Sequence, residues 1–385
     1  MFATFKRGLM VALVTLALAG CKVIPDGGGQ IEGPTTSPVV EAPDAAVLPQ
    51  DATRHRVALL VPLSGRNADV GQSIANATTM ALLDTGAQDL RITTYDTASN
   101  AQAAARRAIA DGNKLILGPL LREDVDAVLA QARPAAVPLI TFSNDVSVAR
   151  PDVLVLGYVP EQSIARTVNF AIDQGARNFA ALIPRSEYGN TALAALEQTL
   201  ARRGARLVST ERFDRGNTSI ISAAGRLNAL DGFDTVLIAD GARLATLAAG
   251  ELKKAGEALP SIIGTELWSG EMDITRANAM RGAWFSAVPD NRYGQFAESY
   301  RSRFGEQPYR ISALGYDAVL MTLRVARDWR VGTNFPTSVM FADGGFLGVD
   351  GVFRFGSNGV GQRAMEVREV KDGSISVVSP APTKF

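Results

Sequence analysis

The stretch VALLVPLSGRNADVGQSIANATTMALLD, residues 57–84, sets the architecture of the chain. Residues 57–61 form an uninterrupted apolar run, which predicts a strand buried on both faces of a parallel sheet. Pro62 and the Ser64–Gly65 pair end this strand in a turn. The apolar residues that follow recur at helical spacing: Val70, Ile74, Ala77 and Met80. A buried strand is therefore followed at once by a helix that packs against it.

The same alternation continues along the chain. Apolar runs predict further strands at residues 90–95, 115–117 and 139–142. Helical patterns separate them at residues 101–110 and 125–132. Four strands alternating with helices are typical of a parallel sheet with helices on both faces.

The rhythm starts again after residue 160. Strands are predicted at residues 179–183, 206–210, 235–239 and 261–264, with helices between them. We therefore expect an α/β protein with two Rossmann-like lobes, each built on a parallel sheet. A crevice is expected where the carboxyl ends of the two sheets meet. Residues 296–329 are predicted to be helical, and after Pro336 the composition changes to strands and turns.

These elements predict a chain that passes more than once between the lobes. We assign residues 54–157 and 290–332 to lobe I, and residues 158–289 and 333–379 to lobe II. Several segments then connect the lobes as a hinge. Such hinges suit closure of two lobes over a ligand.

The N-terminus has the pattern of an export signal. Lys6 and Arg7 precede a short apolar run at residues 9–19, and small residues lead up to Cys21. The run is shorter than the roughly 20 residues needed to cross a bilayer, so residues 1–20 are predicted to be a signal peptide. The ending Leu-Ala-Gly-Cys resembles the bacterial lipobox, which implies that Cys21 carries lipid. An ordinary signal with an incidental cysteine is the alternative.

The segment after this cysteine is predicted to be a flexible tether. Residues 21–53 are rich in Pro, Gly, Ser, Thr and Asp, and such a composition buries too little apolar surface to fold. The residue after the cysteine is Lys22 and not aspartate. In this respect the sequence resembles lipoproteins that are sorted to the outer membrane. We therefore expect a periplasmic protein held on a membrane, the outer one in particular, through acylated Cys21.

Composition excludes several classes of function. The 385 residues have a formal net charge of zero, which argues against a general nucleic-acid binder. Cys21 is the only cysteine and His55 the only histidine, so neither a disulfide nor a Cys/His metal site can form within the chain. Ser–His or Cys–His catalysis would need His55, which is expected to be exposed between two arginines. We expect no enzyme, metal or cofactor.

Short motifs in a fixed order indicate a family. They are the opening stretch, Tyr-Asp at 95–96, Leu-Gly-Pro-Leu at 117–120, Pro-Leu-Ile-Thr-Phe-Ser at 138–143, Ser-Glu-Tyr-Gly at 186–189, Gly-Thr-Glu at 264–266 and Gly-Tyr-Asp-Ala at 315–318. Together they resemble type I periplasmic binding proteins of the leucine/isoleucine/valine class. Within that class the sequence is most similar to the penicillin-binding-protein activator lipoproteins. Better-known members carry an additional N-terminal helical-repeat domain, for which this sequence shows no segment.

The resemblance implies a ligand cleft between the lobes. Its predicted lining residues are Ser64, Gly65, Ser143, Asn144, Tyr188 and Glu266. Glu266 falls where the family places an acid for a ligand's ammonium group; an exposed loop glutamate is the alternative. Leu121 stands where transport proteins place a hydroxyl, and leucine cannot hydrogen-bond a carboxylate. We therefore expect no tight binding of branched-chain amino acids.

The resemblance leaves two functions open. The first is a non-enzymatic regulator of peptidoglycan synthesis that acts through a penicillin-binding protein. The second is a solute-binding receptor of an ABC importer, which takes amino acids or a related small molecule. In either case the partners are a lipid bilayer and a protein, with a small-molecule ligand in the cleft as a further possibility.

Overall fold

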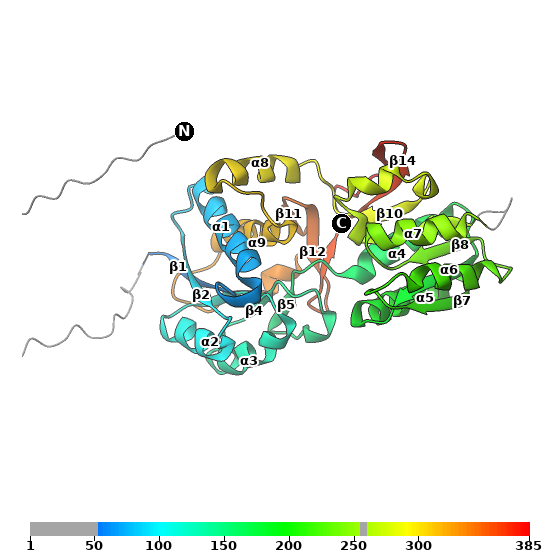
Figure 1. Cartoon of the computed structure of the whole chain (residues 1–385). Helices are drawn as coiled ribbons and strands as arrows, with labels where there is room; N and C mark the ends of the chain where they lie inside the picture. The colour runs from blue at the N-terminus through cyan, green and yellow to red at the C-terminus, as the bar shows by residue number, and fades with distance from the viewer. Residues whose placement is uncertain (1–52, 255–259) are drawn as a thin grey trace, which may run out of the picture. The chain divides into compact units, whose positions relative to one another are not determined.

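A computed structural model describes residues 53–254 and 260–385 of the chain. The predicted signal peptide, Cys21 and nearly all of the predicted tether lie outside these residues. The described strands form sheets of five, seven and three strands (Figure 1). The α/β class predicted from the alternating pattern is confirmed.

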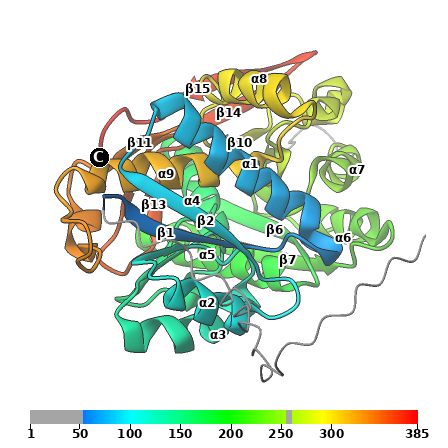
Figure 2. The same cartoon turned by 90° about the vertical axis from the view of Figure 1, so that its left-hand side faces the viewer.

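The first sheet is entirely parallel, in the order β2-β1-β3-β4-β5. Its strands are β1 (His55–Val61), β2 (Leu90–Asp96), β3 (Leu115–Leu117), β4 (Leu139–Thr141) and β5 (Val153–Val155). One face is covered by α1 (Ala68–Thr85) and α9 (Ala313–Ala326), which lie side by side (Figure 2). The other face is covered by α2 (Ala101–Ala110) and α3 (Arg122–Ala132).

Strand β1 explains why the opening run is apolar at every position. Leu59 points into the core beneath α1 and α9, whereas Leu60 points into the core beneath α2 and α3. Both side chains are fully buried. A central strand with helices on both faces has no solvent-facing side, so it shows no polar alternation.

The second sheet has the order β15-β14-β10-β9-β8-β6-β7. Its strands are β6 (Asn178–Pro184), β7 (Arg206–Phe213), β8 (Thr235–Ile238), β9 (Ser261–Ile263), β10 (Trp284–Ala287), β14 (Glu366–Lys371) and β15 (Ser374–Ser379). Its faces are covered by α4 (Pro160–Asp173) and α5 (Glu187–Arg203), and by α6 (Ser219–Asn228) and α7 (Ala242–Leu252).

The prediction of a parallel sheet in both lobes was wrong for part of this second sheet. Strands β6 to β10 are parallel, but β14 pairs antiparallel with β10 and with β15. Only two residues separate β14 from β15, and a connection that short permits only an antiparallel pair. The sheet is therefore mixed.

The third sheet changes the predicted lobe boundary. It consists of the antiparallel strands β11 (Phe346–Gly348), β12 (Gly351–Phe355) and β13 (Gly361–Arg363). Phe346 and Phe353 belong to the same core as α1, α9 and the first sheet. Residues 346–363 therefore pack with lobe I, whereas the sequence had suggested lobe II, and only the segment from β14 onward joins the second sheet.

The long helix predicted for residues 296–329 is interrupted. The structure has α8 (Tyr293–Phe304) and α9, which are separated by a segment that begins at Gly305 with φ +78° and contains Pro308. A positive φ ends a helix readily at glycine, and proline disfavours helical continuation before it.

His55 is buried rather than exposed, which contradicts the expectation. Its side chain is 4% exposed and stacks on Trp329 with ring centroids 4.0 Å apart. Burial lowers the pKa of His55, which favours the neutral form of the ring. The two residues are 274 positions apart (329 − 55), so local sequence gave no sign of the contact.

Gly71 lets α1 approach the turn after β1. A Cβ atom at this position would overlap the carbonyl oxygen of Pro62, which belongs to rigid backbone. We predict that Gly71→Ala lowers the free energy of unfolding by about 3 kcal/mol, because the helix must shift away from the sheet. Urea denaturation of the two proteins measures the difference.

The matched control is Gly250→Ala in α7, where an added Cβ meets no atom within 4 Å. Alanine has the higher helix propensity, so this variant is expected to gain about 0.5–1 kcal/mol. Equal stability of the Gly71→Ala protein and the wild type would show that the close approach is not a constraint.

Candidate functional site

The chain crosses between its two larger sheets by short segments. Residues 156–159 lead from β5 to α4, residues 288–292 lead back from β10 to α8, and residues 364–365 join β13 to β14. Two cavities near these crossings are lined by residues of both lobes. The candidate site is therefore built from strand ends and helix starts of both lobes.

The best-defined contact in this region joins α5 to the segment after β9. The hydroxyl of Tyr188 lies 2.9 Å from Thr265 Oγ1 and donates to Glu266 Oε1 at 3.1 Å. The other carboxylate oxygen, Oε2 of Glu266, is buried and has no hydrogen-bond partner within the described part of the chain. Burial raises the pKa of Glu266 to about 7. Glu266 is thus a partly neutral acid at pH 7 and not the exposed loop glutamate of the alternative reading.

An apolar cavity of about 430 Å³ lies on one side of this contact. The lining residues are Tyr158, Val159, Glu266, Leu267, Ser269, Gly270, Ala287, Val288, Tyr293, Arg310 and Met365. A volume of this size is within the range of small-molecule sites, about 300–1,000 Å³.

A polar cavity of about 320 Å³ lies on the other side and has Tyr188 in its wall. The lining residues are Arg122, Glu123, Asn144, Asp145, Val146, Pro160, Glu161, Glu187, Tyr188 and Thr191. Arg122 Nε contacts Asp145 Oδ2 at 2.7 Å, so these two charges neutralise each other. The other carboxylates in this wall have no arginine or lysine partner among the described residues within ion-pair distance.

The structure brings together some of the predicted cleft residues. Asn144 and Tyr188 line the polar cavity, and Glu266 lines the apolar one. Ser143 is buried and lines neither cavity, and its Oγ accepts from the Asp145 backbone N–H at 3.2 Å.

Two further predicted residues, in the turn after β1, also line neither cavity. Ser64 donates to Asp96 Oδ2 at 2.9 Å in the turn that ends β1. Gly65 follows in that turn with φ +70°. Neither residue lines either cavity, so their contact with a ligand stays a prediction.

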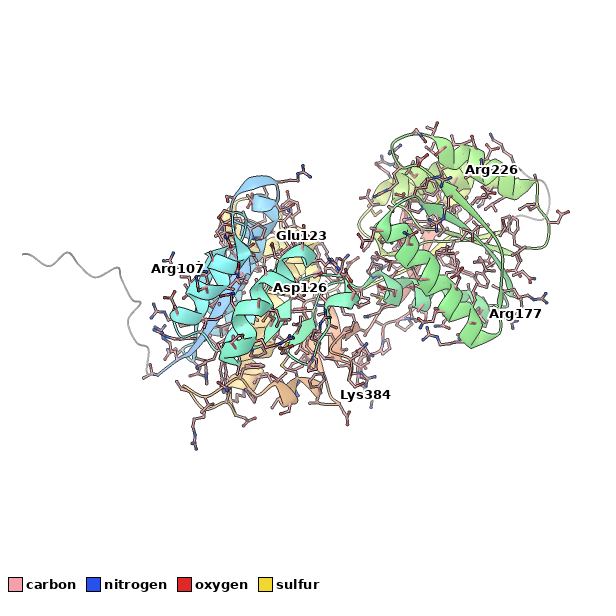
Figure 3. All side chains as sticks on the ribbon, turned by 90° about the horizontal axis from the view of Figure 1, so that it is seen from below. Arg107, Glu123, Asp126, Arg177, Arg226 and Lys384 are labelled. Carbon is pink, nitrogen blue, oxygen red and sulfur yellow. The ribbon has the colours of Figure 1, made fainter. Side chains whose placement is uncertain are left out.

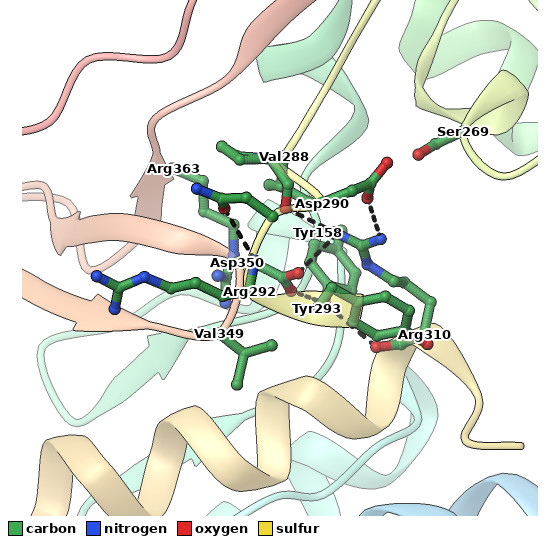
Figure 4. Close-up of polar contacts among 12 residues, drawn as sticks. Tyr158, Ser269, Val288, Asp290, Arg292, Tyr293, Arg310, Val349, Asp350 and Arg363 are labelled. Carbon is green, nitrogen blue, oxygen red and sulfur yellow. Dashed lines mark hydrogen bonds and ion pairs between the residues drawn. The ribbon is translucent and has the colours of Figure 1, made fainter. Parts of the chain in front are cut away.

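Sequence analysis missed a network of buried charges at the crossings (Figure 4). Arg310 Nη2 contacts Asp350 Oδ1 at 2.7 Å and Arg310 Nη1 contacts Asp290 Oδ1 at 2.5 Å. Tyr158 donates its hydroxyl to the other oxygen of Asp350, whose side chain is fully buried. Arg368 of β14 contacts Asp290 at 2.6 Å. The network thereby joins two crossings to the loop between β11 and β12.

Arg363 is the last residue of β13 and extends the network to the third crossing, residues 364–365. Its Nη2 donates to the carbonyl of Leu156 at 3.1 Å, and its Nη1 lies 3.5 Å from Asp317 Oδ2. Asp317 also accepts from the Val349 N–H at 2.6 Å. No sequence signal would have found these pairs, because the partners are separated by 20 to more than 200 positions.

The fold and the paired cavities define a two-lobed binding protein. Residues 55–374 match the family of periplasmic binding proteins, and the chain belongs to that family.

Solved structures with similar folds include receptors and a regulator. A putative branched-chain amino acid ABC transporter protein from Rhodospirillum rubrum has a TM-score of 0.73 and 20% identity, over 84% of this chain and 100% of that one. The C-domain of LpoA from Haemophilus influenzae, described as a regulator of PBP1A, has a TM-score of 0.67 and 19% identity, over 84% and 99%. At this identity the likeness shows the type I periplasmic-binding-protein fold.

Curated relatives match over shorter segments. The penicillin-binding protein activator LpoA of Photobacterium profundum is 26% identical over 143 residues, which are 36% of this chain and 23% of that protein. An uncharacterised protein of Rickettsia prowazekii is 27% identical over 174 residues, 45% of this chain and 47% of that protein. The chain therefore spans less than half the length of these relatives. The resemblance to penicillin-binding-protein activators is confirmed.

Arg310 offers a test of the network at the crossings. Arg310→Met would leave the buried Asp350 carboxylate without its cation, so we expect the free energy of unfolding to fall by about 3 kcal/mol. Adding Asp350→Asn should recover most of this loss, because the uncompensated charge is removed. Urea denaturation at pH 7 measures each protein.

Arg276→Met is the control, since Arg276 and its partner Asp273 have side chains 82% and 84% exposed. An exposed pair contributes little, so no measurable change is expected. A similar loss in both single variants would contradict a special role for the buried network.

The raised pKa of Glu266 predicts that the free energy of unfolding depends on pH. Its pKa is about 7 in the folded chain against an ordinary value of 4.5, so the folded state holds a proton that the unfolded state loses between these values. Stability from this group is present below pH 4.5 and is lost as pH rises to about 7. The loss is about 3 kcal/mol, at about 1.4 kcal/mol for each pH unit in that window.

The measurement is the difference in unfolding free energy between the wild type and Glu266→Gln at pH 4.5, 6 and 8. This difference should shift in favour of the glutamine variant as pH rises. Glu298→Gln makes the same chemical change at a side chain 69% exposed on α8 and serves as the control. A difference that is constant with pH would refute the burial of an acid at this position.

Proposed function

We propose that this chain is a lipid-anchored, non-enzymatic regulator of peptidoglycan synthesis that acts through a penicillin-binding protein. The observation that carries the proposal is the double similarity to LpoA. Sequence relatives of that name match about a third of the chain, and the LpoA C-domain matches the described body in fold.

The proposed anchor is Cys21, exposed by removal of residues 1–20 and joined to the body by residues 21–53. Acyl chains on this cysteine would hold the protein on a membrane, because each buried methylene contributes about 0.8 kcal/mol. Within residues 53–254 and 260–385, no helix has the length and apolar content needed to cross a bilayer. Lys22 supports the outer membrane as the destination, with the body in the periplasm.

A solute-binding receptor of an ABC importer is the second candidate. It is supported by the cavities of about 320 and 430 Å³ at the interlobe crossings and by the similar folds of receptors. Of the predicted cleft residues, Asn144, Tyr188 and Glu266 are the ones we propose to contact a ligand. A receptor role requires a solute that raises the melting temperature through preferential binding to the folded state.

Capture of a synthase tests the leading proposal. The full chain, tagged at its C-terminus, is purified from detergent-solubilised membranes, and co-purified penicillin-binding proteins are detected with labelled penicillin. We expect enrichment of a bifunctional synthase. Absence of every penicillin-binding protein from the eluate would count decisively against a regulator of this kind.

Two variants test whether capture of the synthase depends on the lipid anchor or on the ligand cleft. Cys21→Ser is expected to leave the membrane fraction and yet to capture the synthase in detergent. Glu266→Gln is expected to capture it as the wild type does, since Glu266 is not proposed to contact the partner. Loss of capture in the Glu266→Gln protein would instead link the cleft to the synthase.

A further inference from the structure

The apolar cavity contains a buried acceptor that lacks a donor. Oε1 of Glu266 receives the Tyr188 hydroxyl, whereas Oε2 has no hydrogen-bond partner among the described residues. The Ser163 hydroxyl lies beside this carboxyl but donates to the Ser286 carbonyl at 2.8 Å. Leaving a buried acceptor unpaired costs about 1–3 kcal/mol, and more when it is charged. A ligand that brings an N–H donor to this atom would remove the cost. An ammonium group would also stabilise the ionised carboxylate.

Among its described lining residues, the same cavity has no unpaired cation for a ligand carboxylate. Among the described lining residues the positive charge is that of Arg310, and Asp290 and Asp350 both hold its guanidinium (Figure 4). Its remaining Nε–H is buried without a partner in the described chain. One N–H beside two carboxylates suits a neutral acceptor such as an amide carbonyl, because a carboxylate would be repelled.

The adjoining polar cavity excludes anions by a different arrangement. Helices α3, α4 and α5 begin at its wall, and helix N-termini ordinarily attract anions. Each of these helices carries its own acid in its first turn: Glu123, Glu161 and Glu187. Figure 3 shows Glu123 at the start of α3.

These acids fill the positions that a ligand carboxylate would need. Glu161 repeats the situation of Glu266, since its Oε2 is buried without a partner in the part of the chain described here. Burial raises the pKa of Glu161, and its charge also raises the pKa of Glu266. With Arg122 already paired to Asp145, the wall carries an excess of acidic groups. The cleft therefore favours cations over anions.

We propose that the cleft binds a primary amine that has an apolar body and no free carboxylate, such as an amidated amino acid or the N-terminal residue of a peptide. The ammonium group contacts Glu266, the apolar group fills the cavity beside Val288 and Met365, and an amide carbonyl faces Arg310. This inference concerns the cleft alone and holds whether or not the chain contacts a synthase.

Three probes that share one side chain test the ligand class. The full chain in detergent is titrated calorimetrically with leucinamide, with leucine and with 4-methylpentanoate, which lacks the amine. We expect leucinamide to bind at least about tenfold more tightly than leucine, as one charge-assisted contact can provide, and 4-methylpentanoate not to bind. Binding of leucine as tightly as leucinamide, or binding of none of the probes, would overturn the proposal.

Variants then locate the amine. Glu266→Gln keeps the shape of the side chain and an oxygen for the Tyr188 hydroxyl, and it should weaken leucinamide at least about tenfold. Glu298→Gln on exposed α8 is the matched control and should bind as the wild type does. A thermal melt confirms that each variant is folded. Unchanged affinity in a folded Glu266→Gln protein would contradict the assignment.

A second variant tests the apolar part independently. Val288→Phe narrows the cavity, so it should weaken leucinamide more than glycinamide, which has no side chain to place there. An equal loss for both probes, or no loss for leucinamide, would show that the apolar group does not enter this cavity. The Val288→Phe comparison tests the proposal even if the Glu266→Gln protein does not fold.

Discussion

The pairing of Arg310 with two aspartates is the interaction on which the arrangement of the lobes depends. Asp290 belongs to the crossing that leaves the second sheet, and Asp350 to the loop of the small third sheet. No strand pairing joins these segments directly, so their relative position is set by side chains. A charge pair with one fully buried member fixes geometry strictly, because separating the partners leaves a desolvated charge. Tyr158 and Arg363 bring the remaining crossings into the same network.

This constraint has a consequence for the site. Asp290 and Asp350 neutralise the guanidinium of Arg310, which lines the apolar cavity. Arg310 is therefore not available to pair with a ligand carboxylate. At the same time the Tyr188–Glu266 contact leaves an acid in the wall between the two cavities. Structural support and ligand chemistry are therefore coupled: the residues that hold the crossings also decide which charge the cleft accepts.

Similar folds occur in a putative branched-chain amino acid ABC transporter protein and in a regulator of PBP1A, so the fold alone does not assign the function. What differs between such proteins is the chemistry of the cleft and the surface around it. Here the cleft has acids at three helix starts, which is the reverse of what a carboxylate ligand needs.

Much of the architecture could be read from local pattern. The apolar run at β1, the turn at Ser64 and the helical spacing of α1 are short-range properties, and the repeated alternation predicted the parallel strands β1 to β4 and β6 to β9 with helices on both faces. The motifs from residue 57 to residue 318 indicated the family, and Glu266 and Tyr188 were named as cleft residues from that resemblance. Strands β5 and β10 were not predicted, because strands of three or four residues show no period and can be found only where an apolar run stands out between helical patterns, as it does at β3 and β9.

Burial and charge pairing were decided only by the tertiary structure. His55 lies between two arginines and looks exposed, yet Trp329 covers it. Asp350 sits in a glycine-rich turn and looks solvated, yet it is a fully buried partner of Arg310. The third sheet joined the first lobe because its phenylalanines complete that core. The physical reason is common to all three cases: desolvation and Coulomb energy depend on distances between atoms, and residues far apart in the sequence reach those distances only when the chain has folded.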